Sequence, residues 1–332
     1  MIKTYATLGP ACCEVDTLSA MLRLGLTGFR LNLSHRTLSD CKAWTDALRT
    51  AGEAVGVRPE LIIDLRGAEL RLGSLTRPLL LRIGDTIRFG KMGLPLLDDD
   101  ILAALQPGQT ILIDDGAIEL TVESHDGATA VCRCLRGGTM EGKKSITLPG
   151  IDIPRPAVSA ADHADLAVAR QHGVTAVMQP FVRSRTCLEE VRTALAQHNL
   201  ADLTIFAKVE DAEGVATVSD WMDLCDVVTI ARGDLGSNLC LYDLPRAQKK
   251  IAAACRSADK DFLVVTHLLQ SMIHAPVPTR AEVTDIYNAC LDGAACLMLT
   301  GETAQGKYGI EAVRVLLEVA RRGEADRSSL CE

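Results

Sequence analysis

Short apolar runs alternate with amphipathic helical patterns along most of this chain. The runs that predict β-strands cover residues 3–8, 28–33, 61–64, 176–179, 204–208, 227–231, 262–266 and 296–299. A helical pattern follows each run, directly or further along, and this alternation is typical of a parallel sheet wrapped by helices. Two helix starts carry capping signals, Ser159 with Asp162 and Thr279 with Glu282. Eight such units predict an α/β fold, a (β/α)8 TIM barrel.

One interval departs from this rhythm. Between residues 74 and 146 the chain has short alternating runs at 79–83, 86–89, 110–113, 117–122 and 130–135, separated by Gly, Pro and Asp. They predict an all-β lid domain inserted after the third strand, at the C-terminal mouth of the barrel. Without it about 255 residues remain, close to the roughly 250 of a typical barrel. We therefore expect a barrel domain at 1–73 and 147–332 and a lid at 74–146.

Composition and charge exclude several classes of protein. Of the 332 residues 48% are hydrophobic and 3% aromatic, and 35 basic against 43 acidic side chains give a net charge of -8. A nucleic-acid binder needs a basic surface and often stacking aromatics, so we expect no nucleic-acid partner. No apolar run reaches the roughly 18 residues that span a bilayer, and no signal-peptide core follows Met1. We expect a cytoplasmic protein without membrane contact.

The 12 cysteines do not predict a disulfide framework or a zinc site. They are spread over the whole chain, no CxxC spacing occurs, and most lie in apolar stretches. Small buried thiols are the simpler interpretation.

Polar residues at the predicted strand ends carry the candidate chemistry, because active sites of such barrels lie at the carboxyl ends of the strands. Glu210 and Asp234 follow neighbouring strands and supply hard oxygen ligands suited to Mg²⁺ or Mn²⁺. Arg30, Arg71 and Lys208 supply positive charge for an anionic, phosphorylated substrate. Thr300 and Glu302, after the last strand, could serve only to hold that strand in place.

The motifs at these positions resemble those of pyruvate kinase. They include "RLNLSH" at 30–35, "AKVED" at 207–211, "ARGDLG" at 231–236, "PTRAEVTD" at 278–285 and "LTGETAQGKYGIEAVR" at 299–314. The similarity runs in the family's order from "TLGPA" at 7–11 through "IDLRGAELRLG" at 63–73 to the last barrel helix. It implies a short form without the family's C-terminal regulatory domain, and hence hyperbolic kinetics and at most a homodimer through barrel helices.

The resemblance implies phosphoryl transfer between phosphoenolpyruvate and ADP, giving pyruvate and ATP. Glu210 and Asp234 would hold the Mg²⁺ or Mn²⁺ ion, Lys208 would neutralise the phosphoryl group in flight, and Arg30 would contact the phosphate. The turn formed by Ala231, Arg232, Gly233 and Asp234 would receive the substrate carboxylate through its backbone N–H groups. Thr266 would support proton delivery to enolpyruvate.

The resemblance also implies a K⁺ site and a nucleotide site. The K⁺ ligands would be Asn32, Ser34, Asp64 and the backbone carbonyl of Leu65, and Glu69 is the residue type that accompanies K⁺ dependence. The nucleotide would contact Thr7, Pro10, His35 and Arg71, together with Lys143 from the insert, whose closure would exclude water.

Two other functions remain open. One is an enzyme that uses the same site on a phosphoenolpyruvate analogue or another acceptor, since Arg36, Asp40, His267 and Gln270 differ from the family pattern on the nucleotide side and after strand seven. The other is a non-catalytic phosphoenolpyruvate-binding protein.

Overall fold

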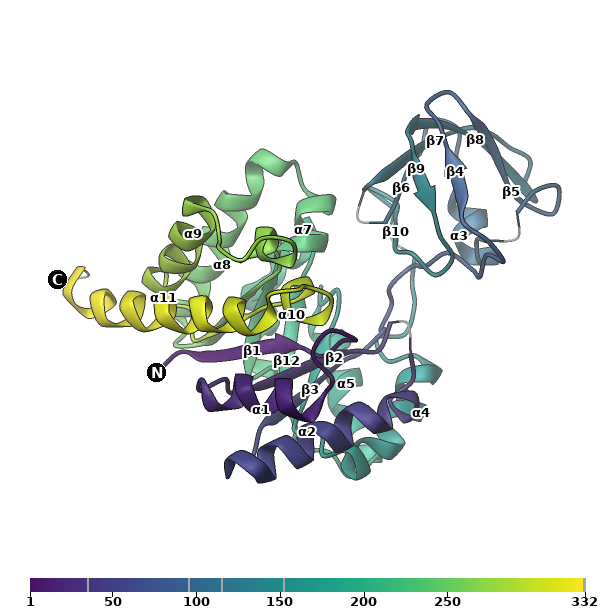
Figure 1. Ribbon diagram of the computed structural model, residues 1–332. Coiled ribbons are helices and arrows are strands. Elements are labelled where there is room, and N and C mark those ends of the chain that lie inside the picture. The colour runs from purple at the N-terminus through teal and green to yellow at the C-terminus, as the bar shows by residue number, and fades with distance from the viewer. Residues whose placement is uncertain (35, 95, 115, 152, 331–332) are drawn as a thin grey trace. The chain divides into compact units, whose positions relative to one another are not determined.

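The structure is a computed structural model that describes residues 1–34, 36–94, 96–114, 116–151 and 153–330. It divides into two compact units, one formed by Met1–Gly67 with Pro156–Glu332 and the other by Ala68–Arg155 (Figure 1). Each unit has its own hydrophobic core. The second unit begins earlier and ends later than the predicted insert at 74–146, because flanking residues such as Leu70, Leu72 and Ile153 pack against its core.

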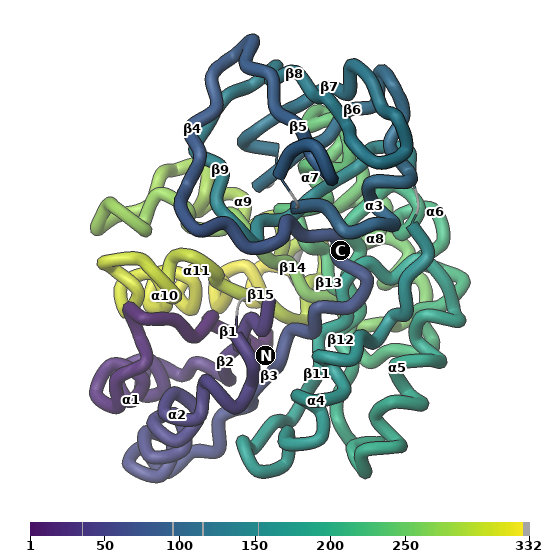
Figure 2. Tube along the Cα trace, turned by 90° about the vertical axis from the view of Figure 1, so that its right-hand side faces the viewer, coloured from purple at the N-terminus to yellow at the C-terminus, as the bar shows by residue number. Residues whose placement is uncertain are grey.

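The first unit is a closed barrel of eight parallel strands. The strands are β1 (Lys3–Thr7), β2 (Gly28–Asn32), β3 (Glu60–Asp64), β11 (Ala176–Gln179), β12 (Thr204–Val209), β13 (Val227–Ala231), β14 (Asp261–Val265) and β15 (Cys296–Met298). Their order around the barrel is β1-β15-β14-β13-β12-β11-β3-β2, and Figure 2 shows them encircled by helices. This confirms the predicted (β/α)8 fold, and all eight predicted strands are present.

Alternate residues of these strands face the barrel interior and the helices. Tyr5, Ile62 and Phe206 belong to the interior cluster, whereas Phe29 and Ile63 belong to the cluster between strands and helices. Parallel strands are thus buried on both faces, and this is why they appear in the sequence as nearly continuous apolar runs. In the same interior phase, Arg30, Asp64 and Lys208 lie toward the carboxyl ends of β2, β3 and β12.

Helices and short 3₁₀ turns connect the strands. The α-helices are α1 (Val15–Arg23), α2 (Lys42–Val55), α4 (Ala160–Val168), α5 (Arg185–Gln197), α6 (Ala212–Trp221), α7 (Arg232–Asn238), α8 (Leu244–Ser257), α9 (Arg280–Leu291), α10 (Gly301–Ala304) and α11 (Gly309–Leu330). The 3₁₀ turns are η1 (Ser39–Cys41), η2 (Ala169–His172), η3 (Met222–Leu224), η4 (Leu241–Asp243) and η5 (Gln270–Ile273).

Both predicted capping signals are confirmed. The Ser159 hydroxyl accepts a hydrogen bond from the Asp162 backbone N–H at 3.1 Å, and the Asp162 carboxylate accepts one from the Ser159 N–H at 2.9 Å. Thr279 and Glu282 form the same reciprocal pair at the start of α9. Each pair satisfies two N–H groups that a helix start otherwise leaves without partners.

The second unit is mainly antiparallel β-structure. Its strands are β4 (Leu79–Leu81), β5 (Thr86–Gly90), β6 (Thr110–Ile113), β7 (Ile118–His125), β8 (Thr129–Arg136), β9 (Gly138–Met140) and β10 (Ile146–Thr147). They form a five-stranded sheet, β10-β6-β7-β8-β5, and a two-stranded sheet, β4-β9. The predicted all-β character is incomplete, because a short helix, α3 (Asp99–Ala104), lies between β5 and β6. Asp99 and Asp100 suit the first turn of a helix, and Ile101 and Leu102 are buried.

Most of the described cysteines are buried, as the sequence predicted. Burial raises the pKa of Cys225, Cys255, Cys290 and Cys296 to about 12, which keeps these thiols protonated and unreactive. Among the described residues, no helix combines the length and the apolar character needed to cross a membrane.

Candidate active site

Four charged side chains meet at the carboxyl ends of β2, β3 and β12. Arg30 donates to Asp64 Oδ2 through Nη2 at 2.5 Å and through Nε at 2.9 Å. Lys208 Nζ lies 3.2 Å from Asp64 Oδ1 and 3.0 Å from Glu210 Oε1. The side chains of Asp64 and Glu210 are 3% and 1% exposed. The barrel therefore brings together residues far apart in the sequence. Arg30 and Lys208 were predicted to bind the substrate, and the two carboxylates were predicted to bind cations.

The charged side chains of this cluster shift one another's pKa values. Burial opposes the charged form of Lys208, but the Asp64 and Glu210 carboxylates outweigh it and raise the lysine pKa above its ordinary value. Burial likewise opposes the charge on Asp64, but Lys208 and Arg30 lower its pKa. Burial is the main cause that raises the pKa of Glu210 to about 8; Lys208 opposes it, and Asp234 and Asp64 reinforce it. Asp234 is a third carboxylate near these two carboxylates and two cationic side chains, and its negative potential favours a proton or a cation there.

The donor set fits a divalent cation. Glu210 Oε1 is buried and lies within ion-pair distance of Lys208, but no donor is aligned to form a hydrogen bond with it. The other oxygen, Oε2, accepts from the Phe181 N–H at 2.8 Å, so the carboxylate is held with one oxygen left for a ligand. Asp234, in the first turn of α7, contributes electrostatically to both Lys208 and Glu210.

Two carboxylates are few for a metal site made of protein alone, and the described residues contain no group of three or more His, Cys, Asp or Glu that could hold an ion. Mg²⁺ commonly binds to one or two carboxylates and completes its shell with water and substrate oxygens. Glu210 and Asp234 are the predicted pair for a site of that type, whose remaining ligands would be water and substrate oxygens.

Thr266 lies in an unusual backbone conformation immediately after β14. Thr266 and His267 have φ angles of 75° and 57°, in the left-handed region that a β-branched residue such as threonine rarely adopts. The Arg232 guanidinium donates to the Thr266 carbonyl through Nη2 at 2.8 Å and through Nε at 3.0 Å, and it pairs with Asp285 at 2.7 Å. The Arg232 side chain thus supports the turn that carries Thr266 and is 8% exposed.

Gly233 leaves space beside Thr266. A Cβ atom at this position would lie 3.2 Å from Thr266 Cγ2 and 3.7 Å from its Oγ1. Gly233 of the Ala231–Asp234 segment therefore lies close to the Thr266 side chain. Only the backbone of Arg232 is available to the predicted substrate-binding role, since its side chain is engaged elsewhere.

The residues predicted to bind nucleotide are divided between the two units. Thr7 is buried next to Arg30. Its hydroxyl accepts a hydrogen bond from Arg30 Nη1 at 3.3 Å and donates one to the Leu299 carbonyl at 2.9 Å. Pro10 is exposed in the turn after β1. In the second unit, Arg71 donates twice to Glu69 and once, at 2.7 Å, to the Lys143 carbonyl. His35 lies outside the described residues.

The residues predicted to bind K⁺ come from β2, β3 and the segments after them. Asn32 and Asp64 face each other in the register of the two strands. Asn32 Oδ1 accepts from the Ser34 N–H at 3.0 Å, and Leu65 is buried, its N–H bonded to the Met178 carbonyl. Asp64 Oδ1 has no aligned hydrogen-bond donor. Asp64 therefore belongs both to this predicted set and to the Arg30–Lys208 cluster.

Several supporting residues were not found from the sequence. Asp285 lies inside one of the quoted motifs, but nothing in its spacing indicates that it pairs with Arg232. Asn238, at the end of α7, donates to the carbonyl oxygens of Glu210 and Asp234. The sequence signal that could have revealed Asn238 is its position four residues after the candidate ligand Asp234, since residues at this spacing are neighbours on a helix. Glu302 accepts from the N–H groups of Leu269 and Thr300, which agrees with a structural role.

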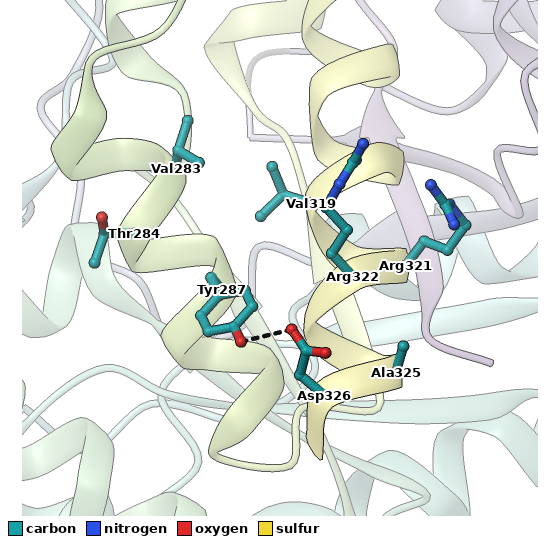
Figure 3. A pocket seen from close by; sticks show the side chains of 8 residues that line it. All are labelled: Val283, Thr284, Tyr287, Val319, Arg321, Arg322, Ala325 and Asp326. Atoms are coloured by element: carbon teal, nitrogen blue, oxygen red, sulfur yellow. Dashed lines mark hydrogen bonds between the residues drawn. The ribbon is translucent and has the colours of Figure 1, made fainter. Parts of the chain in front are cut away.

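A separate groove lies on the outside of the barrel between α9 and α11 (Figure 3). Val283, Thr284 and Tyr287 line it from α9, and Tyr287 donates to Asp326 of α11 at 2.8 Å. None of the predicted site residues lines this groove.

Comparison with known proteins agrees with this geometry. The family described as "Pyruvate kinase, barrel domain" matches residues 1–313. A pyruvate kinase of Aeropyrum pernix is 38% identical over 323 residues, which are 97% of this chain and 70% of that protein. Pyruvate kinases of Mycobacterium intracellulare and Bacillus licheniformis are 34% and 32% identical, and the matches cover 96% and 97% of this chain and 69% and 57% of those proteins. The chain thus spans little more than half the length of some relatives and about two thirds of others.

Both the barrel with its charged rim and the similarity over nearly the whole chain support one assignment: this chain belongs to the pyruvate kinase family of phosphotransferases.

Proposed function

We propose that this chain transfers the phosphoryl group of phosphoenolpyruvate to ADP, giving pyruvate and ATP, with a divalent cation and K⁺. The observation that carries the proposal is the buried Arg30–Asp64–Lys208–Glu210 cluster, in which Asp64 Oδ1 and Glu210 Oε1 have no aligned hydrogen-bond donor and to which Asp234 adds negative potential. Such a cluster suits a cation and an anionic substrate bound together.

Lys208 and Arg30 act on the phosphoryl group. Phosphoryl transfer depends mostly on positioning and on stabilising charge in the transition state. Because its pKa is raised, Lys208 stays protonated at neutral pH and can donate to the phosphoryl oxygens. Asp64 holds both cationic side chains in place, so neither has to reorganise when the substrate binds.

Glu210 and Asp234 would hold Mg²⁺ or Mn²⁺. When bound, this ion would neutralise charge on the carboxylate and phosphate of the substrate. Glu210 is prepared for this role by the Phe181 N–H, which fixes one of its two oxygens.

The remaining residues act on the carboxylate and the enol carbon. The backbone N–H groups of the Ala231–Asp234 turn would receive the carboxylate, and Gly233 leaves the space for it. In the reaction, the bond between phosphorus and the enol oxygen breaks and a bond to the terminal phosphate oxygen of ADP forms. Enolpyruvate then gains a proton at its terminal carbon, and Thr266, whose side chain lies near Gly233, would support that delivery.

Asn32, Ser34, Asp64 and the Leu65 carbonyl would hold K⁺, with Glu69 as the family's companion to K⁺ dependence. Thr7, Pro10, His35, Arg71 and Lys143 stay as predicted nucleotide contacts.

A coupled assay with lactate dehydrogenase tests this function. Purified protein with phosphoenolpyruvate, ADP, Mg²⁺ and K⁺ should form pyruvate, and a chelator should abolish the activity. Lys208→Ala should lower kcat by about 10²–10³-fold or more, because it removes a charge that stabilises the transition state. Lys249→Ala is the matched control, since Lys249 is an exposed lysine of α8 that forms an ion pair with Asp292.

Absence of ADP-dependent pyruvate formation above the Lys208→Ala background would refute the proposal. Phosphoenolpyruvate consumption with another acceptor would instead support the alternative enzyme, and calorimetric binding without turnover would support a non-catalytic binding protein.

A further inference from the structure

The side chain of Asn238 connects the two carboxylate-bearing segments of the site. Asn238 is the last residue of α7, and its Nδ2 donates to the Glu210 carbonyl at 3.1 Å and to the Asp234 carbonyl at 3.0 Å. One amide group therefore contacts the main chain of both candidate metal ligands.

Local helix structure explains only one of these two bonds. A side chain that donates to the carbonyl four residues earlier is a common arrangement in helices, and this accounts for the bond to Asp234. The bond to Glu210 joins residues 28 positions apart, from the end of β12 to the end of α7. It is a tertiary contact, and it requires the amide in its present orientation.

The sheet itself does not fix the separation of the two ligands. The register between β12 and β13 ends at Val209↔Ile230, so Glu210 lies one residue beyond it and Asp234 four residues beyond it. The Phe181 N–H orients the Glu210 side chain through Oε2, but it does not contact Asp234. The Asn238 amide contacts the main chains of both.

We propose that Asn238 is a positioning residue that holds Glu210 and Asp234 at the separation needed to share one divalent cation. The inference rests on the proposed function, because it assumes that these two carboxylates bind the ion. Residues that orient metal ligands without touching the metal change its affinity by about 10–100-fold when they are lost. Asn238 acts on the ligands in this way through their main chains.

Direct binding of Mn²⁺ to the purified chain in the presence of phosphoenolpyruvate, without nucleotide, is the test. Calorimetry and electron paramagnetic resonance would give the Kd of the unsubstituted protein and of Asn238→Ala, Asn238→Gln and Cys240→Ala. We expect Asn238→Ala to raise the Kd about tenfold or more. Asn238→Gln keeps the amide on a longer side chain and should recover part of the affinity. Cys240→Ala, a change of an exposed side chain two residues further on, should leave the Kd unchanged.

Kinetics separate positioning from general damage to the fold. For Asn238→Ala the Mn²⁺ concentration at half-maximal rate should rise with the Kd, whereas kcat at saturating Mn²⁺ should stay close to that of the unsubstituted protein. An equal Kd for folded Asn238→Ala and the unsubstituted chain would overturn the inference and leave the proposed function standing. If Asn238→Ala does not fold, an unchanged Kd for Asn238→Ser, whose hydroxyl is too short to reach both carbonyls, would overturn it equally. No Mn²⁺ binding by the unsubstituted chain would refute the proposed function itself.

Discussion

Asp64 is the residue on which the charged cluster depends. It was expected among the K⁺ ligands, and its side chain also binds Arg30 and lies 3.2 Å from Lys208. Both roles are compatible, because a carboxylate has two oxygens with several acceptor directions. The second role could not be predicted from the sequence, since residues 30, 64 and 208 meet only through the order of the strands around the barrel.

Replacing Asp64 should therefore destabilise the protein. In Asp64→Asn the two buried cationic groups lose their shared counter-charge, and removal of one member of a buried ion pair lowers the free energy of unfolding by about 3–5 kcal/mol. Urea denaturation would measure the change as a lower midpoint. Asp223→Asn, which removes the partner of Arg185 in an exposed pair, serves as the control and should show no measurable change. Equal midpoints for the two variants would contradict this account.

The elements show how a helix end and a loop are tied together. At the start of α9 the Glu282 carboxylate closes the capping box with Thr279 and also accepts from the backbone N–H and hydroxyl of Ser271 at 2.7 Å and 2.6 Å. The capping pair was visible in the sequence as a spacing of three residues. The bonds to Ser271 were not, because they depend on how η5 packs against α9.

This arrangement predicts a pH dependence of stability. Burial opposes ionisation, but the hydrogen bonds from Ser271 and Thr279 lower the pKa of Glu282 below its ordinary value of 4.5. A carboxyl group with a lower pKa in the folded state stabilises the fold above its unfolded pKa, and this contribution is lost as the pH falls through the folded pKa. The difference in urea midpoint between the unsubstituted protein and Glu282→Gln should therefore shrink between about pH 6 and about pH 3.

Thr284→Ala is the control, because it removes a hydroxyl from the same helix without removing a titrating group. Its difference from the unsubstituted protein should be similar at both pH values. A Glu282→Gln difference that does not vary with pH would show that the hydrogen bonds of Glu282 do not favour its charged form.

At the scale of the whole molecule, two separate hydrophobic cores indicate two units that can loosen independently. Ile113 of β6 is fully buried in the core of the Ala68–Arg155 unit, and Leu18 of α1 is fully buried in the barrel core. Truncation of a buried isoleucine or leucine to alanine lowers stability by about 2–5 kcal/mol. In Ile113→Ala, hydrogen exchange measured by mass spectrometry should increase within residues 68–155 and remain unchanged in the barrel strands.

Leu18→Ala provides the reciprocal test and should increase exchange in the barrel. If either substitution increased hydrogen exchange equally in both units, the two units would unfold together as one cooperative body. That result would contradict the prediction that they unfold independently.

The sequence by itself determined the barrel, its eight strands and both capping boxes. These features rest on local periodicity and on residues a few positions apart, and burial on both faces of parallel strands leaves a strong apolar signal. Its motifs also selected Arg30, Lys208, Glu210 and Asp234. Only the tertiary structure decided that Asp64 pairs with Arg30, that Arg232 supports the Thr266 turn and that Asn238 reaches Glu210. Those contacts join distant elements, and their existence depends on strand order and register, which no local pattern of side chains encodes.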